Sequence, residues 1–76
     1  MRNQQDPTAA AVRAMLAYHD KTQIEAAAVL GLSQAGVSRR LGGLTEFQPS
    51  ELRTLAAWLG VSPAQLLGND DMRTAS

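Results

Sequence analysis

Gln34, Ser38 and Arg39 are the residues of this chain whose types and spacing best suit chemistry at a polar surface. Helical spacing would place all three on one side of a helix. A glutamine carboxamide can form paired hydrogen bonds with the edge of an adenine, and an arginine guanidinium can do the same with a guanine. The segment from Leu30 to Leu44 holds two arginines and no acid. The alternative for each of these side chains is ordinary solvated surface, so their use depends on the elements that carry them.

No other cluster of side chains indicates a reaction or a metal site. His19 has no second histidine, no cysteine and no nearby acid cluster that would complete a set of metal ligands. Glu25, Glu46 and Glu51 do not pair with a nucleophile at a plausible spacing. A chain of 76 residues also leaves little room for a substrate pocket. We therefore expect no enzymatic activity, no metal, no cofactor and no small-molecule ligand.

The length and composition indicate one small domain. Because the chain has no cysteine, helix packing rather than disulfides or thiolate metal sites must stabilise it. Its formal charge is balanced, with seven basic and seven acidic residues. No apolar run approaches the roughly 20 residues of a membrane span, and the first residues lack the apolar core of a signal peptide. We expect a soluble intracellular protein that makes no membrane contact.

Alanine and leucine dominate the chain and β-branched runs are missing, which is typical of an all-helical domain. Residues suited to capping predict where the helices begin: Asp6 before Pro7, Thr22, Ser33, Gln48 before Pro49, and Ser62 before Pro63. Glycines predict where they end. We thus expect five helices, over residues 7–19, 23–30, 34–41, 49–59 and 63–67. The predicted domain spans residues 6–68, and residues 1–5 and 69–76 are predicted to be flexible ends.

The break between the second and third predicted helices is only three residues long, Gly31-Leu32-Ser33. Two short helices joined by a tight turn containing glycine describe the helix-turn-helix, whose second helix lies in the DNA major groove. Ala27 is small where the two helices would approach each other, and Val37 would carry the third helix into the core. The other predicted core residues are Val12, Met15, Leu16, Leu30, Leu32, Leu41, Phe47, Leu52, Leu55, Ala56, Trp58, Leu59 and Leu66. Val61, Pro63 and Leu67 would either offer an exposed apolar surface to a second copy of the chain or fill the core.

Residues 22–67 resemble the phage repressor and Cro-type (XRE-like) helix-turn-helix domain family. The resemblance is carried by a Gln-x₃-Ala-x₃-Gly-x-Ser-Gln-x₂-Val-Ser run from Gln23 to Ser38, followed downstream by Leu-Gly-Val-Ser and Gln-Leu-Leu. It implies a compact five-helix, lambda-repressor-like fold that binds DNA. The chain departs from the family at Ala26, where a large aliphatic residue is common, and at Ile24 and Val29, where polar residues are common. A slight rotation of the second helix or an extra apolar patch would each explain this.

The resemblance also implies which residues contact DNA. Base contacts are expected from Gln34, Ala35, Ser38 and Arg39, where Ala35 can only touch a thymine methyl group or leave room. Phosphate contacts are expected from Thr22, Gln23, Ser33, Arg40 and Thr45. Thr22 and Ser33 can serve as helix caps at the same time, and Thr45 can equally be a plain loop residue. Arg40 would meet either a backbone phosphate or an acid such as Glu46, because it points about 100° away from Arg39 around the helix.

The expected function is therefore sequence-specific binding of double-stranded DNA by a transcriptional regulator, most like a small Cro-type bacteriophage repressor that occupies an operator. It would act in the cytoplasm of a bacterial cell, on the nucleoid. A single domain contacts only a few base pairs, so useful affinity needs a homodimer on a palindrome or cooperative loading on adjacent sites. The alternative is an antitoxin-like or other protein-interaction module that uses Ile24, Val29 and the last helix. The acid-free polar face of residues 34–39 favours DNA.

Overall fold

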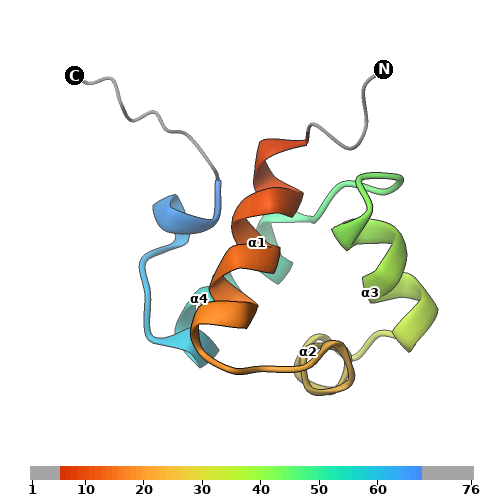
Figure 1. Ribbon diagram of the computed structural model, residues 1–76, viewed down its shortest axis with the longest axis horizontal. Helices are drawn as coiled ribbons and strands as arrows, with labels where there is room; N and C mark the ends of the chain where they lie inside the picture. The colour runs from red at the N-terminus through yellow and green to blue at the C-terminus, as the bar shows by residue number, and fades with distance from the viewer. Residues whose placement is uncertain (1–5, 68–76) are drawn as a thin grey trace.

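The computed structural model describes residues 6–67 of the chain. Within this range the protein is a small all-helical globule without strands, as expected (Figure 1). Its elements are α1 (Pro7–Tyr18), α2 (Gln23–Leu30), α3 (Gln34–Leu41), α4 (Pro49–Leu59) and a short 3-10 helix, η2 (Pro63–Leu66). The predicted flexible ends, residues 1–5 and 69–76, lie outside the described residues, as does Gly68.

The helices begin at the residues that their sequences predict, because each has a local cap. The Asp6 carboxylate accepts the backbone amide of Thr8 at 3.0 Å, directly before Pro7 opens α1. Thr22 and Ser33 cap α2 and α3 in the same way. At α4 the side chain of Glu51 accepts the backbone amide of Gln48 at 2.8 Å. These bonds satisfy amides that a helix start otherwise leaves without a partner.

The last element differs from the expected α-helix over residues 63–67. It is a single four-residue 3-10 turn, η2, whose start is fixed by Ser62 and Gln65. So short a segment cannot complete an α-helix and is held by its packing instead. Leu66 is fully buried, whereas Leu67, which we expected either in the core or on an exposed dimer surface, is 44% exposed. One turn is therefore enough to insert a single leucine into the core.

A single core joins all five elements. Its apolar residues come from the inner face of each helix and from Phe47 in the segment before α4. The buried members are Val12, Leu16, Ala26, Ala27, Val37, Leu41, Phe47, Leu52, Leu55, Ala56, Leu59 and Leu66, with Met15, Leu30, Leu32, Trp58 and Val61 packed partly against them. Truncating a buried leucine to alanine typically costs about 2 to 5 kcal/mol, so the fully buried Leu55 and Leu66 each matter in a domain this small.

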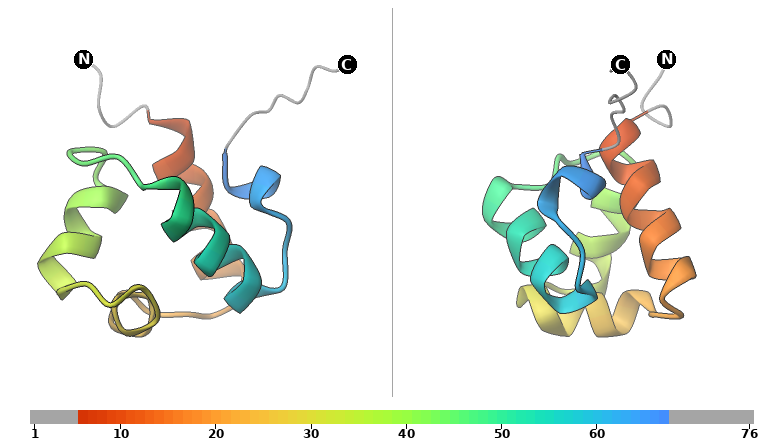
Figure 2. Two further views of the ribbon diagram at one scale, coloured as in Figure 1. Left: turned by 180° about the vertical axis from the view of Figure 1, so that it is seen from behind. Right: turned by 90° about the vertical axis from the view of Figure 1, so that its left-hand side faces the viewer.

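The arrangement leaves α3 at one side of the molecule. Figure 2 shows α2 crossing one end of the domain, with α1 and α4 rising from it on opposite sides. α2 packs against both α3 and α4, and α1 packs against α3 and η2. The described ends of the chain meet where the Thr8 hydroxyl donates to the carbonyl oxygen of Leu67 at 3.1 Å. α3 is thus supported from behind by α1 and α2 while its outer side stays uncovered within the described chain.

Candidate nucleic-acid interface

The turn between α2 and α3 is built by Gly31. Its φ of 69° lies in the left-handed region that glycine adopts without strain. The amide of Gly31 donates to the carbonyl of Ala28 at 3.3 Å, and the amide of Leu32 donates to that of Ala27 at 3.0 Å. This pair of bonds is the Schellman arrangement, which ends a helix sharply. Because α3 begins only three residues later, its direction relative to α2 is fixed by the turn.

The outer face of α3 is polar and exposed. All four residues expected to contact bases are exposed: Gln34, Ala35, Ser38 and Arg39. At about 100° per residue they fall within a sector of about 140° around the helix. The opposite side of α3 is buried through Gly36, Val37 and Leu41. The helix therefore presents a continuous face with one guanidinium, one carboxamide, one hydroxyl and no carboxylate of its own.

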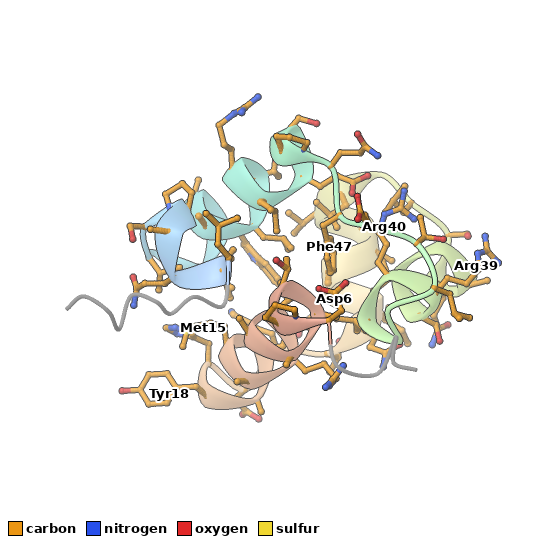
Figure 3. All side chains as sticks on the ribbon, turned by 90° about the horizontal axis from the view of Figure 1, so that it is seen from above. Asp6, Met15, Tyr18, Arg39, Arg40 and Phe47 are labelled. Carbon is orange, nitrogen blue, oxygen red and sulfur yellow. The ribbon has the colours of Figure 1, made fainter. Side chains whose placement is uncertain are left out.

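Arg39 and Arg40 have different surroundings. Figure 3 shows Arg39 extending away from the body of the domain, whereas Arg40 lies beside the segment that leads into α4. Nε of Arg40 donates to Oε1 of Glu51 at 2.9 Å, and its Nη1 donates to the carbonyl of Gly36 at 3.1 Å. The side chains of this ion pair are only 15% and 14% exposed. The acid that meets Arg40 is therefore Glu51 of α4, and not the Glu46 that its position in the sequence suggests.

A second arginine holds α3 from the other side. Arg13 of α1 donates from Nη1 to the carbonyl oxygen of Leu41, the last residue of α3. A cation at this end of a helix also complements the partial negative charge of its last carbonyl groups. Sequence reasoning missed this contact because Arg13 and Leu41 are 28 residues apart and no local pattern links them. The C-terminal half of α3 is thus tied to α1 through Arg13 and to α4 through Arg40.

The start of α2 holds two of the expected phosphate contacts, Thr22 and Gln23. Both residues are exposed. Thr22 forms a capping box with Glu25: the Thr22 hydroxyl accepts the Glu25 amide at 3.1 Å, and Glu25 Oε1 accepts the Thr22 amide at 2.8 Å. The Thr22 hydroxyl also donates to the same carboxylate at 3.2 Å. The hydroxyl proton of Thr22 is therefore already used inside the capping box. Of Thr22 and Gln23, only Gln23 has a side chain that can reach outward.

The capping box changes the acidity of Glu25. The pKa of its carboxyl lies below the ordinary value of 4.5, chiefly because the backbone amide of Thr22 donates to the carboxylate. Desolvation acts against this shift, while the Thr22 hydroxyl and the charge of Lys21 support it. Glu25 is consequently ionised at neutral pH. A negative charge sits at the same helix end where the sequence predicts a phosphate.

Ser33 and Thr45 flank α3 at its two ends. The Ser33 hydroxyl oxygen accepts the amide of Gly36 at 3.0 Å, which leaves its proton able to be donated outward. After α3 the amides of Gly43 and Leu44 donate to the carbonyls of Arg40 and Arg39, at 3.1 and 2.9 Å. These amides complete the end of α3 and are not directed at a phosphate. The phosphate contact expected in this loop would therefore come from the hydroxyl of Thr45, which is half-buried.

Several large apolar side chains are exposed outside the α3 face. Ile24 at the start of α2 is 65% exposed, and Leu44 after α3 is 69% exposed. Tyr18 at the end of α1 is 80% exposed and meets His19 edge to face, with 5.1 Å between ring centroids. Ala26 is buried beside Ala27, and Val29 is half-buried. The apolar patch that α2 offers therefore consists mainly of Ile24.

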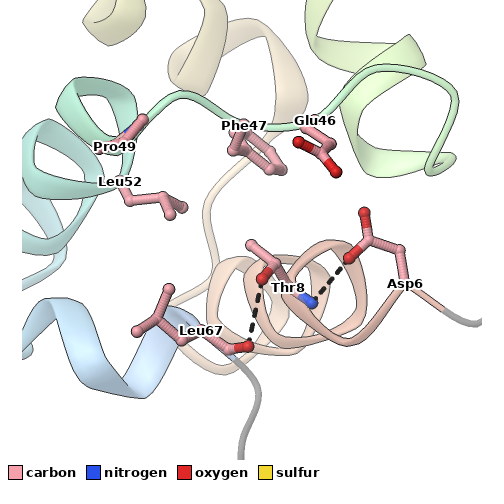
Figure 4. Close-up of a pocket in the computed structure, with 7 residues that line it drawn as sticks. All are labelled: Asp6, Thr8, Glu46, Phe47, Pro49, Leu52 and Leu67. Carbon is pink, nitrogen blue, oxygen red and sulfur yellow. Dashed lines mark hydrogen bonds between the residues drawn. The ribbon is translucent and has the colours of Figure 1, made fainter.

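A groove of about 380 Å³ lies between the start of α1, the segment before α4 and the end of η2 (Figure 4). Phe47 and Leu52 line its apolar part, together with Pro49 and Leu67, and Asp6, Thr8 and Glu46 line its polar part. The Asp6 carboxylate caps α1, and the Thr8 hydroxyl is bonded to Leu67. Because Asp6 and Thr8 already bond at helix ends, we assign no ligand to the groove.

Neither a helix that could span a membrane nor a cluster of metal-ligating side chains is found between residues 6 and 67. No helix in this range has the length and apolar character that crossing a membrane requires. No set of three or more histidine, cysteine, aspartate or glutamate side chains in the same range is grouped closely enough to hold a metal ion. Lys21, two residues after His19, packs on an aromatic ring: its ammonium lies 5.3 Å from the centre of the Trp58 ring.

The fold and this surface define a small all-helical domain that presents one short, polar, acid-free helix on a rigid support. A family model described as the BetR domain matches residues 4–76, which is nearly the whole chain. The chain therefore belongs to the BetR domain family. Nothing among the curated proteins and nothing among the solved structures matched it.

Proposed function

We propose that this domain is a sequence-specific double-stranded DNA-binding transcriptional regulator, of the kind represented by small Cro-type phage repressors. In this proposal α2 and α3 form a helix-turn-helix, and α3 enters the major groove. The whole domain corresponds to a lambda-repressor-like fold in which η2 takes the place of a fifth helix. Operator occupancy would repress transcription in the cytoplasm of a bacterial cell, on the nucleoid, without an enzymatic step or a cofactor.

The observation that carries the proposal is the outer face of α3. A helix of eight residues follows a glycine turn with φ of 69° and exposes Gln34, Ser38 and Arg39 on the side away from the core. These are the side-chain types that read base edges in a groove wide enough for a helix. A protein-binding face would instead be rich in aromatic and large apolar residues, which the exposed side of α3 lacks.

The remaining contacts follow from the surroundings of each residue. Gln34, Ala35, Ser38 and Arg39 are assigned to bases. Gln23, Ser33 and Thr45 are assigned to phosphates, because each has a polar group that can be directed outward. The Thr22 hydroxyl could donate to a phosphate only if its hydrogen bond to Glu25 broke. We therefore assign Thr22 mainly to the helix cap. Such phosphate contacts fix the orientation of the domain and carry no sequence information themselves.

A single α3 spans only a few base pairs, so specific affinity at physiological salt needs a second copy of the domain. A homodimer would place two α3 helices about 34 Å apart on a palindrome, and cooperative loading on adjacent sites is the other arrangement. The apolar residues available to a second copy are Pro63 at the start of η2 and Leu67 after its end, which are exposed, with the half-buried Val61 beside them in the sequence. Sequence symmetry in the bound DNA distinguishes the two arrangements.

The test is selection from a random double-stranded DNA library with sequencing of the retained fraction, at two salt concentrations. The proposal predicts enrichment of a defined sequence, and the symmetry of that sequence distinguishes a homodimer on a palindrome from cooperative loading on adjacent sites. Affinity should fall with salt as phosphate contacts release counterions. Retention of all sequences alike, or of none, would contradict the proposal.

A second function is favoured by Ile24 and Leu44, which are large, apolar and more than 60% exposed. They would suit an antitoxin-like or other protein-interaction module on the same fold. We rank this function second because the two residues lie on different elements and single exposed apolar residues are common on protein surfaces. Capture of a protein partner that Ile24→Ser abolishes, with no selected DNA sequence, would place it first.

A further inference from the structure

We infer that Arg40 and Glu51 set the base specificity of this domain by positioning α3, without touching DNA. The inference rests on the proposed DNA-binding function and concerns residues outside the exposed face. Arg40 belongs to the same helix as Gln34 and Arg39, and Glu51 belongs to α4. The ion pair that joins them is therefore a direct link between the recognition helix and the body of the domain.

The geometry shows how the link works. Glu51 Oε1 accepts both Nε of Arg40, at 2.9 Å, and the backbone amide of Gln48, at 2.8 Å. The Glu51 carboxylate is thus held at the start of α4 by the Gln48 amide while it also accepts Arg40 of α3. Arg40 is anchored in turn to its own helix through the carbonyl of Gly36, at 3.1 Å. Both ends of the pair are tied to backbone, so the pair restricts rotation and sliding of α3 against α4.

The shielding of the pair argues against a phosphate contact for Arg40. Its side chain is 15% exposed and two of its nitrogen atoms already donate to oxygen. Binding a phosphate would require Arg40 to leave Glu51 and uncover a carboxylate close to DNA. Arg39, which is exposed, has no such constraint. Positioning matters because paired hydrogen bonds to a base tolerate little displacement of the side chains that make them.

The test compares four variants of the full chain on a selected duplex and on a scrambled duplex. Arg40→Lys keeps the charge but cannot reproduce the two-nitrogen geometry of the guanidinium. Arg40→Met removes the charge and keeps the apolar stem. Glu51→Gln keeps an acceptor for the Gln48 amide and removes the charge. Arg53→Met on the exposed side of α4 is the matched control for loss of one arginine.

Positioning predicts that Arg40→Lys and Arg40→Met each lower the ratio of specific to scrambled affinity by about tenfold or more, the size of the effect of removing one bidentate base pairing. Glu51→Gln should lower the ratio less, and Arg53→Met should leave it unchanged. The salt slope of Arg40→Met should equal that of the parent. Helicity and melting temperature identify folded variants, and the ratio is measured well below melting, where lower stability alone would not change it.

Three results would overturn the inference. A uniform loss on both duplexes for Arg40→Met, with the salt slope smaller by about one unit and Arg40→Lys like the parent, would make Arg40 a phosphate contact. Stronger binding of Glu51→Gln to both duplexes would also make Arg40 a phosphate contact, because that variant frees Arg40 from its ion pair. Parent-like ratios in both Arg40 variants would show that the link is not needed. A parent protein that selects no sequence would instead reject the proposed function itself, and that result comes before any variant is made.

Discussion

Nε of Arg40 lies 2.9 Å from Oε1 of Glu51, and the same oxygen accepts the backbone amide that opens α4. One carboxylate thereby serves as a helix cap and as the partner of an arginine from another helix. Together with the bond from Arg13 to the carbonyl of Leu41, it holds the C-terminal half of α3 from two sides. The N-terminal half is set by the Gly31 turn and the Ser33 cap. The inner side of α3 is consequently held along the whole helix, and its outer face is exposed.

Gln34→Ala and Arg39→Ala should each relax base preference at one position and leave helicity unchanged. Both side chains are exposed, so their removal disturbs no packing. Removing each pair of hydrogen bonds should reduce discrimination at that position by about 1 to 3 kcal/mol. Repeating the library selection with each variant measures this. If both variants recovered the parental sequence at full stringency, the assignment of the recognition face would be wrong.

Gln23→Ala should weaken binding to every sequence by a similar factor. Gln23 is exposed at the start of α2, where its bond to a phosphate would position the domain without reading bases. Affinities measured across a salt series should fall in parallel with those of the parent, because glutamine is neutral and its bond to a phosphate releases no counterion. Thr54→Ala in α4 is a control from an exposed polar residue on another element, whose hydroxyl donates to the carbonyl of Ser50 in the same helix. A change in base preference for Gln23→Ala would contradict the phosphate role.

Gly31→Val should destabilise the domain through its backbone alone. A Cβ at Gly31 would meet nothing within 4 Å, so the cost comes from a φ of 69°. A left-handed conformation costs about 1 to 2 kcal/mol for residues other than glycine, and a β-branched residue lies at the upper end. The melting temperature should fall by about 4 to 8 °C for each kcal/mol of stability removed.

The control for this substitution is Gly36→Ala in α3. A Cβ there would lie 3.4 Å from the Ser33 hydroxyl and 3.6 Å from Nη1 of Arg40, which are ordinary contacts, and no positive φ opposes it. Alanine is favoured over glycine inside a helix by about 1 kcal/mol. Gly36→Ala should therefore match or exceed the parent in thermal stability. An unchanged melting temperature for Gly31→Val would remove our explanation of the turn.

The capping box at Thr22 and Glu25 should make stability depend on pH in the acid range. The pKa of Glu25 is lower in the folded chain than its ordinary value of 4.5, so the folded state favours the ionised carboxylate. This stabilisation is present above pH 4.5 and is lost as the pH falls through the lower pKa of the folded state. Melting curves of the parent and Glu25→Gln should differ near neutral pH and converge in acid. A constant difference throughout the acid range would contradict this account.

Local signals account for what the sequence predicts correctly. Asp6, Thr22 and Ser33 act on amides two or three residues away, so their caps are visible in a short stretch of sequence. The left-handed glycines that end α2 and α4 are equally local. The spacing of leucines in α4 also predicts its buried face, because a helix brings every third or fourth residue together.

The contacts that fix α3 could not be predicted in the same way. Arg13 and Leu41 are 28 residues apart, and Arg40 and Glu51 are 11 apart, so neither pair follows from helical spacing. Which acid meets Arg40 depends on how α4 packs against the rest of the domain. From the sequence we expected a phosphate or an acid such as Glu46, whereas the acid that Arg40 meets is Glu51. The 3-10 form of η2 likewise depends on tertiary packing of Leu66.

The central claim is that α3 reads base edges in the major groove, and single-atom changes in the selected duplex test it most directly. Replacing one purine at a time by its 7-deaza analogue removes the N7 acceptor that glutamine and arginine use. Replacing guanine by inosine removes only its minor-groove amino group. Our account predicts losses of about 1 to 3 kcal/mol at particular 7-deaza purines, with Gln34→Ala insensitive at one of them and Arg39→Ala at another. Sensitivity to inosine alone, or an unchanged pattern in both variants, would contradict it.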